Sequence, residues 1–184
     1  MEKKLDCVIL GLLSHEELTG YEIKKRMDTA LHYFWGASYG SIYPTLDGLV
    51  ERDLAIRREL PGDPRKKQVY AITDAGRDYL REWLKRPAER DEIRYETLLK
   101  LFFGNEGGPA QAIAHIEAFQ AKLEAEQAAL MQSMERLRAV LDQPDPDETH
   151  TYYYLTAEFG RRAFDAYLEW CREAKALLEK KLSL

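Results

Sequence analysis

The sequence predicts a mainly α-helical protein in which a small helical unit with one β-hairpin precedes two long helices. Apolar residues recur at helical spacing through most of the 184 residues, change to a period of two near residues 54–72, and return at heptad spacing in the second half. With 45% hydrophobic residues, the chain is long enough for one ordinary core and a smaller addition. We expect a first domain over residues 1–86, a connecting helix and linker over 87–108, and a helical domain over 109–184.

The N-terminal apolar stretch is too short and too interrupted to cross a membrane. Asp6 and Cys7 fall inside the segment LDCVILGLL, which then runs into SHEEL. We therefore expect a cytoplasmic protein. Cys7 and Cys171 lie far apart within apolar helical patterns, so we expect two reduced, buried thiols; the alternative, a redox sensor, needs an exposed thiolate.

Two helices open the chain. Leu5, Ile9 and Leu13 stand at helical spacing and predict a short, buried helix over residues 5–13. Thr19 and Glu22 then match a T-x-x-E capping box, in which each side chain accepts a hydrogen bond from a free backbone N–H of the first turn. A second helix is therefore predicted to begin directly after Thr19.

A third helix follows the break HYFWGASYG. Either Ser38 or Ser41 is expected to cap it. Ile42, Leu46 and Leu49 follow at i, i+4 and i+7, which predicts that all three are buried. Pro44 favours the later start, because proline is tolerated only within the first turn of a helix.

Between residues 54 and 72 the apolar period becomes two. Leu54, Ile56 and Leu60 alternate on one side, as do Tyr70 and Ile72, so two half-buried strands are predicted. The turn PGDP joins them in a loop long enough to project.

A fourth helix is predicted after the hairpin. Thr73 is expected to cap it, and Pro87 to end it. The residues expected to face inward are Ala75, Tyr79, Trp83 and Leu84.

This order of elements is that of a winged helix-turn-helix. In such a unit the third helix is held by its inner face, its N-terminal turn and outer face enter the major groove of DNA, and the hairpin lies beside the DNA backbone. Arg65, Lys66 and Lys67 at the hairpin tip are suited to neutralise phosphates, and the neighbouring prolines and glycine limit the ordering entropy of the loop. An ordinary solvated charge run is the alternative interpretation.

The net charge of -5 does not oppose DNA binding by the first domain. The first 85 residues hold 14 Lys and Arg against 14 Asp and Glu, so the acidic excess lies in the remaining residues. The neutral charge of the domain is a weak electrostatic signal, so the positions of the cations matter more than their number: they stand in the wing and at Lys24 in the second helix.

Three segments of the first domain resemble the PadR-type transcriptional regulators: LTGYEIKKRM, YGSIYPTLDGLVERDLAI and KKQVYAITDAGRDYLREWL. Together they cover nearly the whole of residues 5–85. Gly20 and Tyr21 match the family's G-Y-x-I segment, GSIYPTLDGL its recognition-helix signature, and YAITDAGR its second wing strand leading into helix four. Asp53 departs from the pattern, because many members carry a glycine at this place after the recognition helix.

The resemblance implies a homodimeric, usually repressing protein that binds a palindromic operator and whose affinity responds to a small effector or another cellular signal. Transferred residue by residue, together with Lys24 from the second helix, the expected DNA contacts are Tyr39, Ser41, Tyr43, Pro44, Lys24, Arg65, Lys66 and Lys67. The alternatives are that Tyr43 packs between helices and that Ser41 only caps.

The second half predicts two long helices. From Pro109, a residue suited to the first turn of a helix, apolar residues step by three and four, which predicts a helix of roughly thirty residues and about 45 Å. Gln120 and Gln127 occupy seam positions, where a polar side chain lowers stability but restricts register and partner choice. The segment DQPDPDET ends this helix, and a final helix is predicted from about His150 to Leu182.

The apolar faces of these two helices are wider than one antiparallel hairpin needs, so we expect a second subunit to bury the surplus in a coiled-coil dimer. The residues expected at this interface are Ile116, Leu123, Leu130, Leu137, Phe164, Tyr167 and Leu178. The layout resembles the longer PadR subgroup, whose helical C-terminal region, also seen in AphA-like virulence activators, makes the dimer. The segment 95–104 is expected to bridge the two parts, and a two-fold dimer would present recognition helices roughly 34 Å apart.

Aromatic residues supply a hypothesis for the effector site. Family members sometimes bind planar ligands in a cavity between the winged domain and the dimer helices, and the candidate lining residues for a small aromatic effector are Phe34, Trp35, Tyr153 and Trp170. An aromatic stripe at helical spacing is also typical of plain core.

The sequence does not indicate an enzyme. The four histidines show no H-E-x-x-H spacing, neither cysteine belongs to a C-x-x-C pair, and there is no phosphate-binding glycine loop or G-x-S-x-G elbow. We expect no catalysis, metal or cofactor. A winged-helix module that binds protein without operator binding remains the alternative function.

Overall fold

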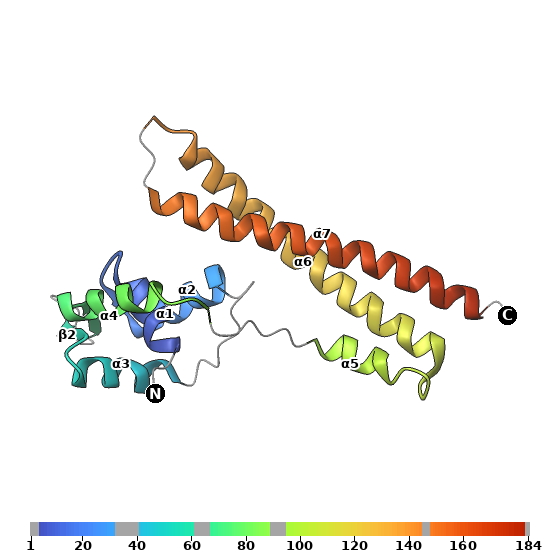
Figure 1. Ribbon diagram of the computed structural model, residues 1–184, viewed down its shortest axis with the longest axis horizontal. Coiled ribbons are helices and arrows are strands. Elements are labelled where there is room, and N and C mark those ends of the chain that lie inside the picture. The colour runs from blue at the N-terminus through green and yellow to red at the C-terminus, as the bar shows by residue number, and fades with distance from the viewer. Residues whose placement is uncertain (1–3, 32–40, 61–66, 89–94, 145–147, 183–184) are drawn as a thin grey trace. The chain divides into compact units, whose positions relative to one another are not determined.

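The computed structural model describes residues 4–31, 41–60, 67–88, 95–144 and 148–182. The chain forms two compact units, Met1–Asp91 and Glu92–Leu184 (Figure 1). The predicted class is confirmed: the protein is mostly helical, with a small antiparallel sheet in the first unit and long helices in the second. No helix within the described ranges is long and apolar enough to span a membrane.

The first unit has the element order predicted for a winged helix-turn-helix, with one additional short strand. Its elements are α1 (Lys4–Leu13), β1 (Leu18–Thr19), α2 (Gly20–Arg26), the π-helical turn η1 (Met27–Leu31), α3 (Ile42–Glu51), β2 (Ala55–Glu59), β3 (Gln68–Ile72) and α4 (Asp74–Leu84).

The start of α2 confirms the predicted capping box. The Thr19 N–H donates to Glu22 Oε2 at 2.8 Å, and the Glu22 N–H donates to Thr19 Oγ1 at 3.2 Å. The backbone hydrogen bond from Thr19, followed by that from its side chain, lowers the pKa of Glu22 below its ordinary value. The first turn of α2 is therefore fixed by its own residues.

The sheet has the strand order β1-β3-β2, and both pairings are antiparallel. Strand β3 is central, which explains why Val69, Tyr70 and Ala71 are buried in succession. Leu18 of β1 pairs with Tyr70, and Ala55 of β2 pairs with Ile72. The two residues of β1 are too few to show a period of two, so this strand was not predicted.

The predicted alternation along the first wing strand is wrong after Leu54. Leu54 is buried in the turn before β2 and Ala55 is the buried residue of the strand, whereas Ile56 is 43% exposed and Leu60 40% exposed. The strand begins one residue later than the pattern suggested, so Ile56 points away from the core. Beyond Ala55 the strand leaves the core and projects as a wing.

The core of the first unit lies against the inner face of α3. Ile42, Leu46 and Leu49 are at most 2% exposed, which confirms their predicted burial. The other buried members of this core are Ile9, Leu10, Leu13, Leu18, Ile23, Met27, Leu54, Ala55 and Tyr70.

Helix α4 is capped by Thr73 as predicted, and the Gly76 N–H donates to Thr73 Oγ1 at 3.0 Å. Its inner face differs from the prediction, because Ala75 and Leu84 are exposed. Gly76 is buried instead: a Cβ atom there would lie 2.1 Å from the carbonyl oxygen of Leu54. This close approach turns α4 so that Gly76, Tyr79 and Leu80 face the core.

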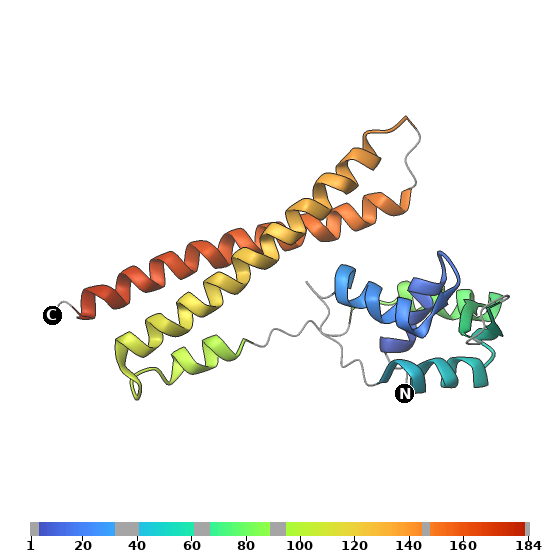
Figure 2. The ribbon, with the colours of Figure 1, turned by 180° about the vertical axis from the view of Figure 1, so that it is seen from behind.

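The second unit consists of α5 (Glu96–Phe102), α6 (Gly108–Leu141) and α7 (Glu148–Leu182). Helices α6 and α7 run side by side in opposite directions in both views (Figures 1 and 2), as the heptad pattern predicted. Helix α6 begins with Pro109 in its first turn, also as predicted. The predicted reduced, buried thiols are confirmed: Cys7 and Cys171 are both free and buried, and burial raises the pKa of Cys171.

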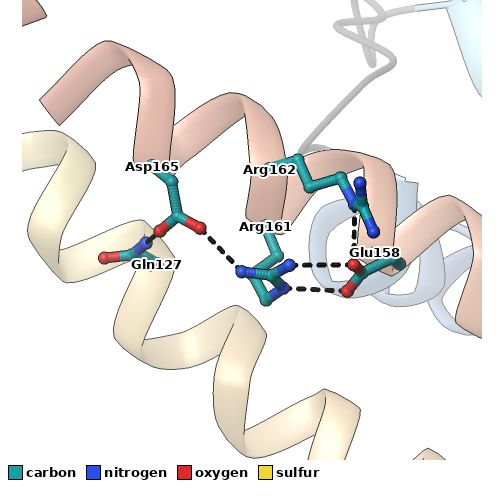
Figure 3. Close-up of polar contacts among 5 residues, drawn as sticks. All are labelled: Gln127, Glu158, Arg161, Arg162 and Asp165. Atoms are coloured by element: carbon teal, nitrogen blue, oxygen red, sulfur yellow. Dashed lines mark hydrogen bonds and ion pairs between the residues drawn. The ribbon is translucent and has the colours of Figure 1, made fainter. Parts of the chain in front are cut away.

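The two seam glutamines have different environments. Gln127 Nε2 donates to Asp165 Oδ1 at 2.7 Å and so joins α6 to α7 (Figure 3). Asp165 also accepts from Arg161 at 2.6 Å, and Arg161 forms a two-pronged pair with Glu158 (Figure 3). Gln120 bonds only to Glu124 of its own helix among the contacts described, and its Oε1 atom is buried without a partner. Gln127 is therefore the seam glutamine that restricts the register of the hairpin.

Candidate nucleic-acid interface

The N-terminal turn of α3 is the exposed part of a helix that is otherwise held from inside. Ser41 occupies the N-cap position but its side chain makes no capping hydrogen bond, so the alternative of a purely capping role is not what the structure shows. Tyr43 is 61% exposed, and Ser41 and Pro44 are exposed as well. Three of the predicted DNA-contacting residues thus lie together on one outward-facing turn, opposite the buried Ile42.

The C-terminal end of α3 is closed by a left-handed turn. The Leu54 N–H donates to the Leu49 carbonyl at 2.9 Å and the Asp53 N–H donates to the Val50 carbonyl at 3.0 Å, the two bonds of a Schellman motif. Asp53 has a φ of 57°, in the region that favours glycine. This geometry explains the departure noted in the sequence: the position calls for glycine, and aspartate tolerates the left-handed conformation better than most residues.

An ion pair between a buried carboxylate and a partly exposed arginine holds the same end of α3 against the rest of the unit. Arg52 Nη2 donates to Asp6 Oδ2 at 2.9 Å, and Arg52 Nε donates to the Gly48 carbonyl at 2.9 Å. The Asp6 side chain is only 5% exposed, and the guanidinium lies 6.0 Å from the ring centroid of Tyr79 in α4. Burial disfavours the charged form of Arg52, but the hydrogen bond and charge of Asp6 outweigh it and raise the pKa of Arg52. The Arg52 guanidinium group therefore links α1, α3 and α4 through its contacts with Asp6, Gly48 and Tyr79.

Sequence reasoning missed this pair. In the sequence, Asp6 interrupts the apolar segment LDCVILGLL and excludes a membrane span, but no nearby residue indicates its partner. Asp6 is nevertheless a signal of its own, because a carboxylate on a buried helix requires a cation, and that cation can come from anywhere in the chain.

The described arginines around α3 and the wing are paired with carboxylates. Arg57 of β2 lies 3.0 Å from Asp47 of α3, and Arg58 contacts Glu17. Arg26 of α2 contacts Glu16. These pairs are solvent-exposed, and such pairs contribute about 0–1 kcal/mol each. Because these arginines are held so weakly, each can release its carboxylate partner and bind a phosphate instead.

Two of the predicted lysine contacts, Lys24 and Lys67, lie within the described residues. Lys24 lies on the exposed side of α2, and Lys67 is exposed directly before β3. Thr19, the N-cap residue of α2, pairs with Val69 of β3, so the base of the wing lies near the first turn of α2. The predicted residues Tyr39, Arg65 and Lys66 lie outside the described residues, as do Ser38 and the candidate effector residues Phe34 and Trp35.

The two described candidate effector residues are not neighbours. Tyr153 and Trp170 both lie on α7, and their separation of 17 residues corresponds to about 25 Å along a helix. Tyr153 contacts the His150 ring, whereas Trp170 contacts Phe119 at 6.5 Å. Near Trp170, the Tyr95 ring packs edge-on against Phe119 and Tyr167. Burial and the hydrogen bond with Tyr167 raise the pKa of Tyr95 to about 12.

Most of the predicted dimer residues are covered within one chain. Ile116, Leu123, Leu130 and Phe164 are at most 6% exposed in the α6–α7 hairpin. Leu137, Tyr167 and Leu178 are half-buried. A separate apolar stripe remains uncovered on α7, where Tyr152, Leu155 and Phe159 stand at i, i+3 and i+7 and are 60–70% exposed.

Comparison with known proteins matches both units. Residues 9–82 match the model of the transcriptional regulator PadR-like family, and residues 93–179 match the model of the virulence activator alpha C-terminal region. The chain is 30% identical to the negative transcriptional regulator PadR of Bacillus subtilis over 181 residues, which cover 96% of this chain and 98% of that protein. The chain belongs to the PadR-like family of transcriptional regulators.

Solved structures of PadR-like proteins have the same fold. Bacillus subtilis PadR in complex with operator DNA matches with a TM-score of 0.83 at 27% identity, over 96% of this chain and 99% of that one. The same protein in complex with p-coumaric acid matches with a TM-score of 0.73 at 29% identity, over 96% and 99% of the two chains. The Vibrio cholerae virulence activator AphA matches with a TM-score of 0.71 at 27% identity, again over 96% and 99%.

Proposed function

We propose that the chain is a homodimeric repressor that binds a palindromic operator through α3 and the wing and is released by a small aromatic effector. The observation that carries the proposal is the exposed turn of Ser41, Tyr43 and Pro44 on a helix whose opposite face is buried. A helix anchored in this way can place its N-terminal residues in a major groove without losing its own packing. The likeness over nearly the whole chain to a PadR solved with operator DNA supports this role.

The proposed dimer uses the second unit. The hairpin already covers Ile116, Leu123, Leu130 and Phe164, so the surface that a partner would bury is the α7 stripe of Tyr152, Leu155 and Phe159, with the half-buried predicted residues beside it. An apolar stripe of this kind on a charged protein is typical of an interface. We expect the full chain to have the mass of a dimer in light scattering.

A charge placed on this stripe tests the interface. Phe159→Lys should convert the dimer to a monomer, because Phe159 is 70% exposed in one chain and would be buried by the partner. Leu84→Lys is the matched control, since Leu84 is 64% exposed in the first unit, outside the proposed interface. A dimer that survives Phe159→Lys would contradict this placement.

The DNA contacts are tested by salt. Affinity for the intergenic DNA upstream of the chain's own gene should fall steeply with salt, and each phosphate contact contributes a slope of about -0.9 on logarithmic axes. Lys66→Ala and Lys67→Ala should each reduce that slope by about 0.9 and weaken binding, while Lys122→Ala on α6 serves as the exposed-lysine control. If neither wing substitution changes affinity or slope, the wing contacts are wrong; a protein-binding module would lack the steep salt dependence altogether.

Release by an effector is tested with the native tryptophans. A planar aromatic acid such as p-coumaric acid, which a solved PadR binds, should weaken operator binding and change the fluorescence of Trp35 or Trp170. Trp170 lies in an aromatic cluster with Phe119, so a ligand in contact with that cluster would alter its emission. Trp170→Phe leaves the signals of Trp35 and Trp83, and Trp35→Phe leaves those of Trp83 and Trp170, so the two variants together assign a change to one residue. Operator binding and fluorescence that are both unchanged at millimolar ligand would contradict release by this class of compound.

A further inference from the structure

Gly20 lies directly beneath the side chain of Tyr43. A Cβ atom built on Gly20 would be 2.6 Å from Tyr43 Cε1, 3.0 Å from Cζ and 3.2 Å from the hydroxyl oxygen. Gly20 is buried although it is the first residue of α2, and Tyr43 remains 61% exposed on the first turn of α3. The Tyr43 ring thus rests on the backbone of the neighbouring helix and presents its remaining surface to solvent.

Backbone conformation does not require glycine at position 20. Asp53 and Gly108 are the described residues with a positive φ, and Gly20 is not one of them. Alanine is the better helix former, so local propensity also favours a side chain here. The requirement is therefore space for the Tyr43 ring. Gly11 in α1 provides a contrast, because a Cβ atom at Gly11 would meet nothing within 4 Å.

The clash would be relieved by moving the tyrosine and not the helices. Its nearest atoms belong to the far end of an exposed side chain, which can rotate away at little cost. The opposite holds at Gly76, where the added atom would meet the backbone of Leu54 at 2.1 Å. A methyl group at Gly20 should therefore change the direction of Tyr43 while leaving the stability of the unit unchanged.

We propose that Gly20 is a positioning residue for operator recognition. Because Gly20 has no side chain, the Tyr43 ring can pack against the backbone of α2, and this packing sets the direction of the phenol before DNA binds. This inference rests on the proposed DNA-binding role of α3. Ordering a free side chain on binding would weaken affinity roughly 2- to 10-fold, and a ring directed away from its contact would weaken it further. We expect Gly20→Ala to weaken operator binding about tenfold.

A double-mutant cycle on the full chain tests the proposal. The variants are Gly20→Ala, Tyr43→Ala and the two combined, with Gly11→Ala as the matched control. Operator affinity is measured by fluorescence anisotropy on the upstream intergenic duplex, and folding by the urea midpoint. Gly20→Ala should weaken binding with an unchanged midpoint, should have no further effect once Tyr43 is alanine, and Gly11→Ala should bind like the unmodified chain.

The possible failures are distinguishable. If the unmodified chain shows no salt-dependent binding, the proposed function fails and the inference fails with it. If the unmodified chain binds and Gly20→Ala binds equally well, or weakens binding by the same factor with and without Tyr43, the positioning role is wrong while DNA binding stands. If Gly20→Ala lowers the urea midpoint in both backgrounds, its role is structural and the inference is overturned.

Discussion

Replacing Arg52 with alanine should destabilise the protein far more than replacing Arg57. The two arginines are closely matched: their side chains are 44% and 47% exposed, and they lie 2.9 Å and 3.0 Å from a carboxylate. Their partners differ, because the side chain of Asp6 is 5% exposed and that of Asp47 is 56% exposed. The largest difference between the two pairs is therefore the burial of the carboxylate that is left behind, to which Arg52 adds its bond to the Gly48 carbonyl.

The magnitude follows from that difference. Removing one partner of a fully buried pair costs about 3–5 kcal/mol, and the partial exposure of Arg52 reduces this range to about 2–4 kcal/mol. The loss of the Arg52 bond to the Gly48 carbonyl falls within this range. For Arg57→Ala the expected change is below about 0.5 kcal/mol, because Asp47 simply returns to water. Asp6→Ala should lie between the two, because Arg52 without its partner can turn toward solvent.

The assay is urea denaturation of the full chain at neutral pH, followed by circular dichroism. The slope m is compared across variants so that a change in midpoint can be read as a change in stability. The double variant Asp6→Ala with Arg52→Ala should be more stable than the sum of the single effects implies, since it leaves no buried charge. Equal effects of Arg52→Ala and Arg57→Ala would refute the argument, and so would an additive cycle.

The remaining predictions concern the helix ends and the hairpin. Asp53→Gly should raise the free energy of unfolding by about 1 kcal/mol by relieving the left-handed conformation, whereas Asp53→Ala should not, as the urea midpoints will show. Gly76→Ala should cost about 2–3 kcal/mol, because the added methyl group meets a backbone oxygen; a folded variant of unchanged midpoint would contradict the observed packing. Hydrogen bonds from Arg161 and then Arg162 lower the pKa of Glu158 to about 2, so its contribution is present above the ordinary value of 4.5 and is lost as the pH falls toward 2. Stability should therefore fall less between pH 5 and pH 2 in Glu158→Gln than in the unmodified chain, and parallel curves for the two would contradict this.

Features that depend on local periodicity or local hydrogen bonding were predictable from the sequence. The capping box of Thr19 and Glu22, the burial of Ile42 and Leu46, and the first turn of α6 around Pro109 each depend on residues within one or two turns. The period-two pattern predicted a hairpin but placed Ile56 in the core. The apolar residues of this strand do not alternate strictly, so the sequence does not show at which residue the strand begins and which face is buried. Strand β3 is central because β1 pairs with its other edge. Predicting that position requires predicting β1, and its two residues are too few to show a pattern.

Contacts between distant segments were not predictable in the same way. Arg52 and Asp6 are separated by 46 positions, and no spacing rule links them. Gly20 was recognised as part of a motif, but the reason for the glycine is a ring from another helix. The predicted dimer residues on α6 illustrate the same limit: a heptad seam shows that a side chain is buried, but does not distinguish a partner helix in the same chain from one in a second subunit.

These distant contacts restrict how an effector of the proposed kind can act. At its C-terminal end, α3 is held by the Schellman turn at Asp53 and by Arg52, whose guanidinium is bonded to α1. At its N-terminal end, α3 is held by Ile42 and Leu46, which are at most 2% exposed in the core of the first unit. A helix fixed at both ends to its neighbours moves only with the whole unit, because packed cores do not deform continuously. In the proposed dimer, release from an operator would then come from a change in the spacing of the two copies of α3, to the extent that the proposed effector binds one spacing more tightly than the other.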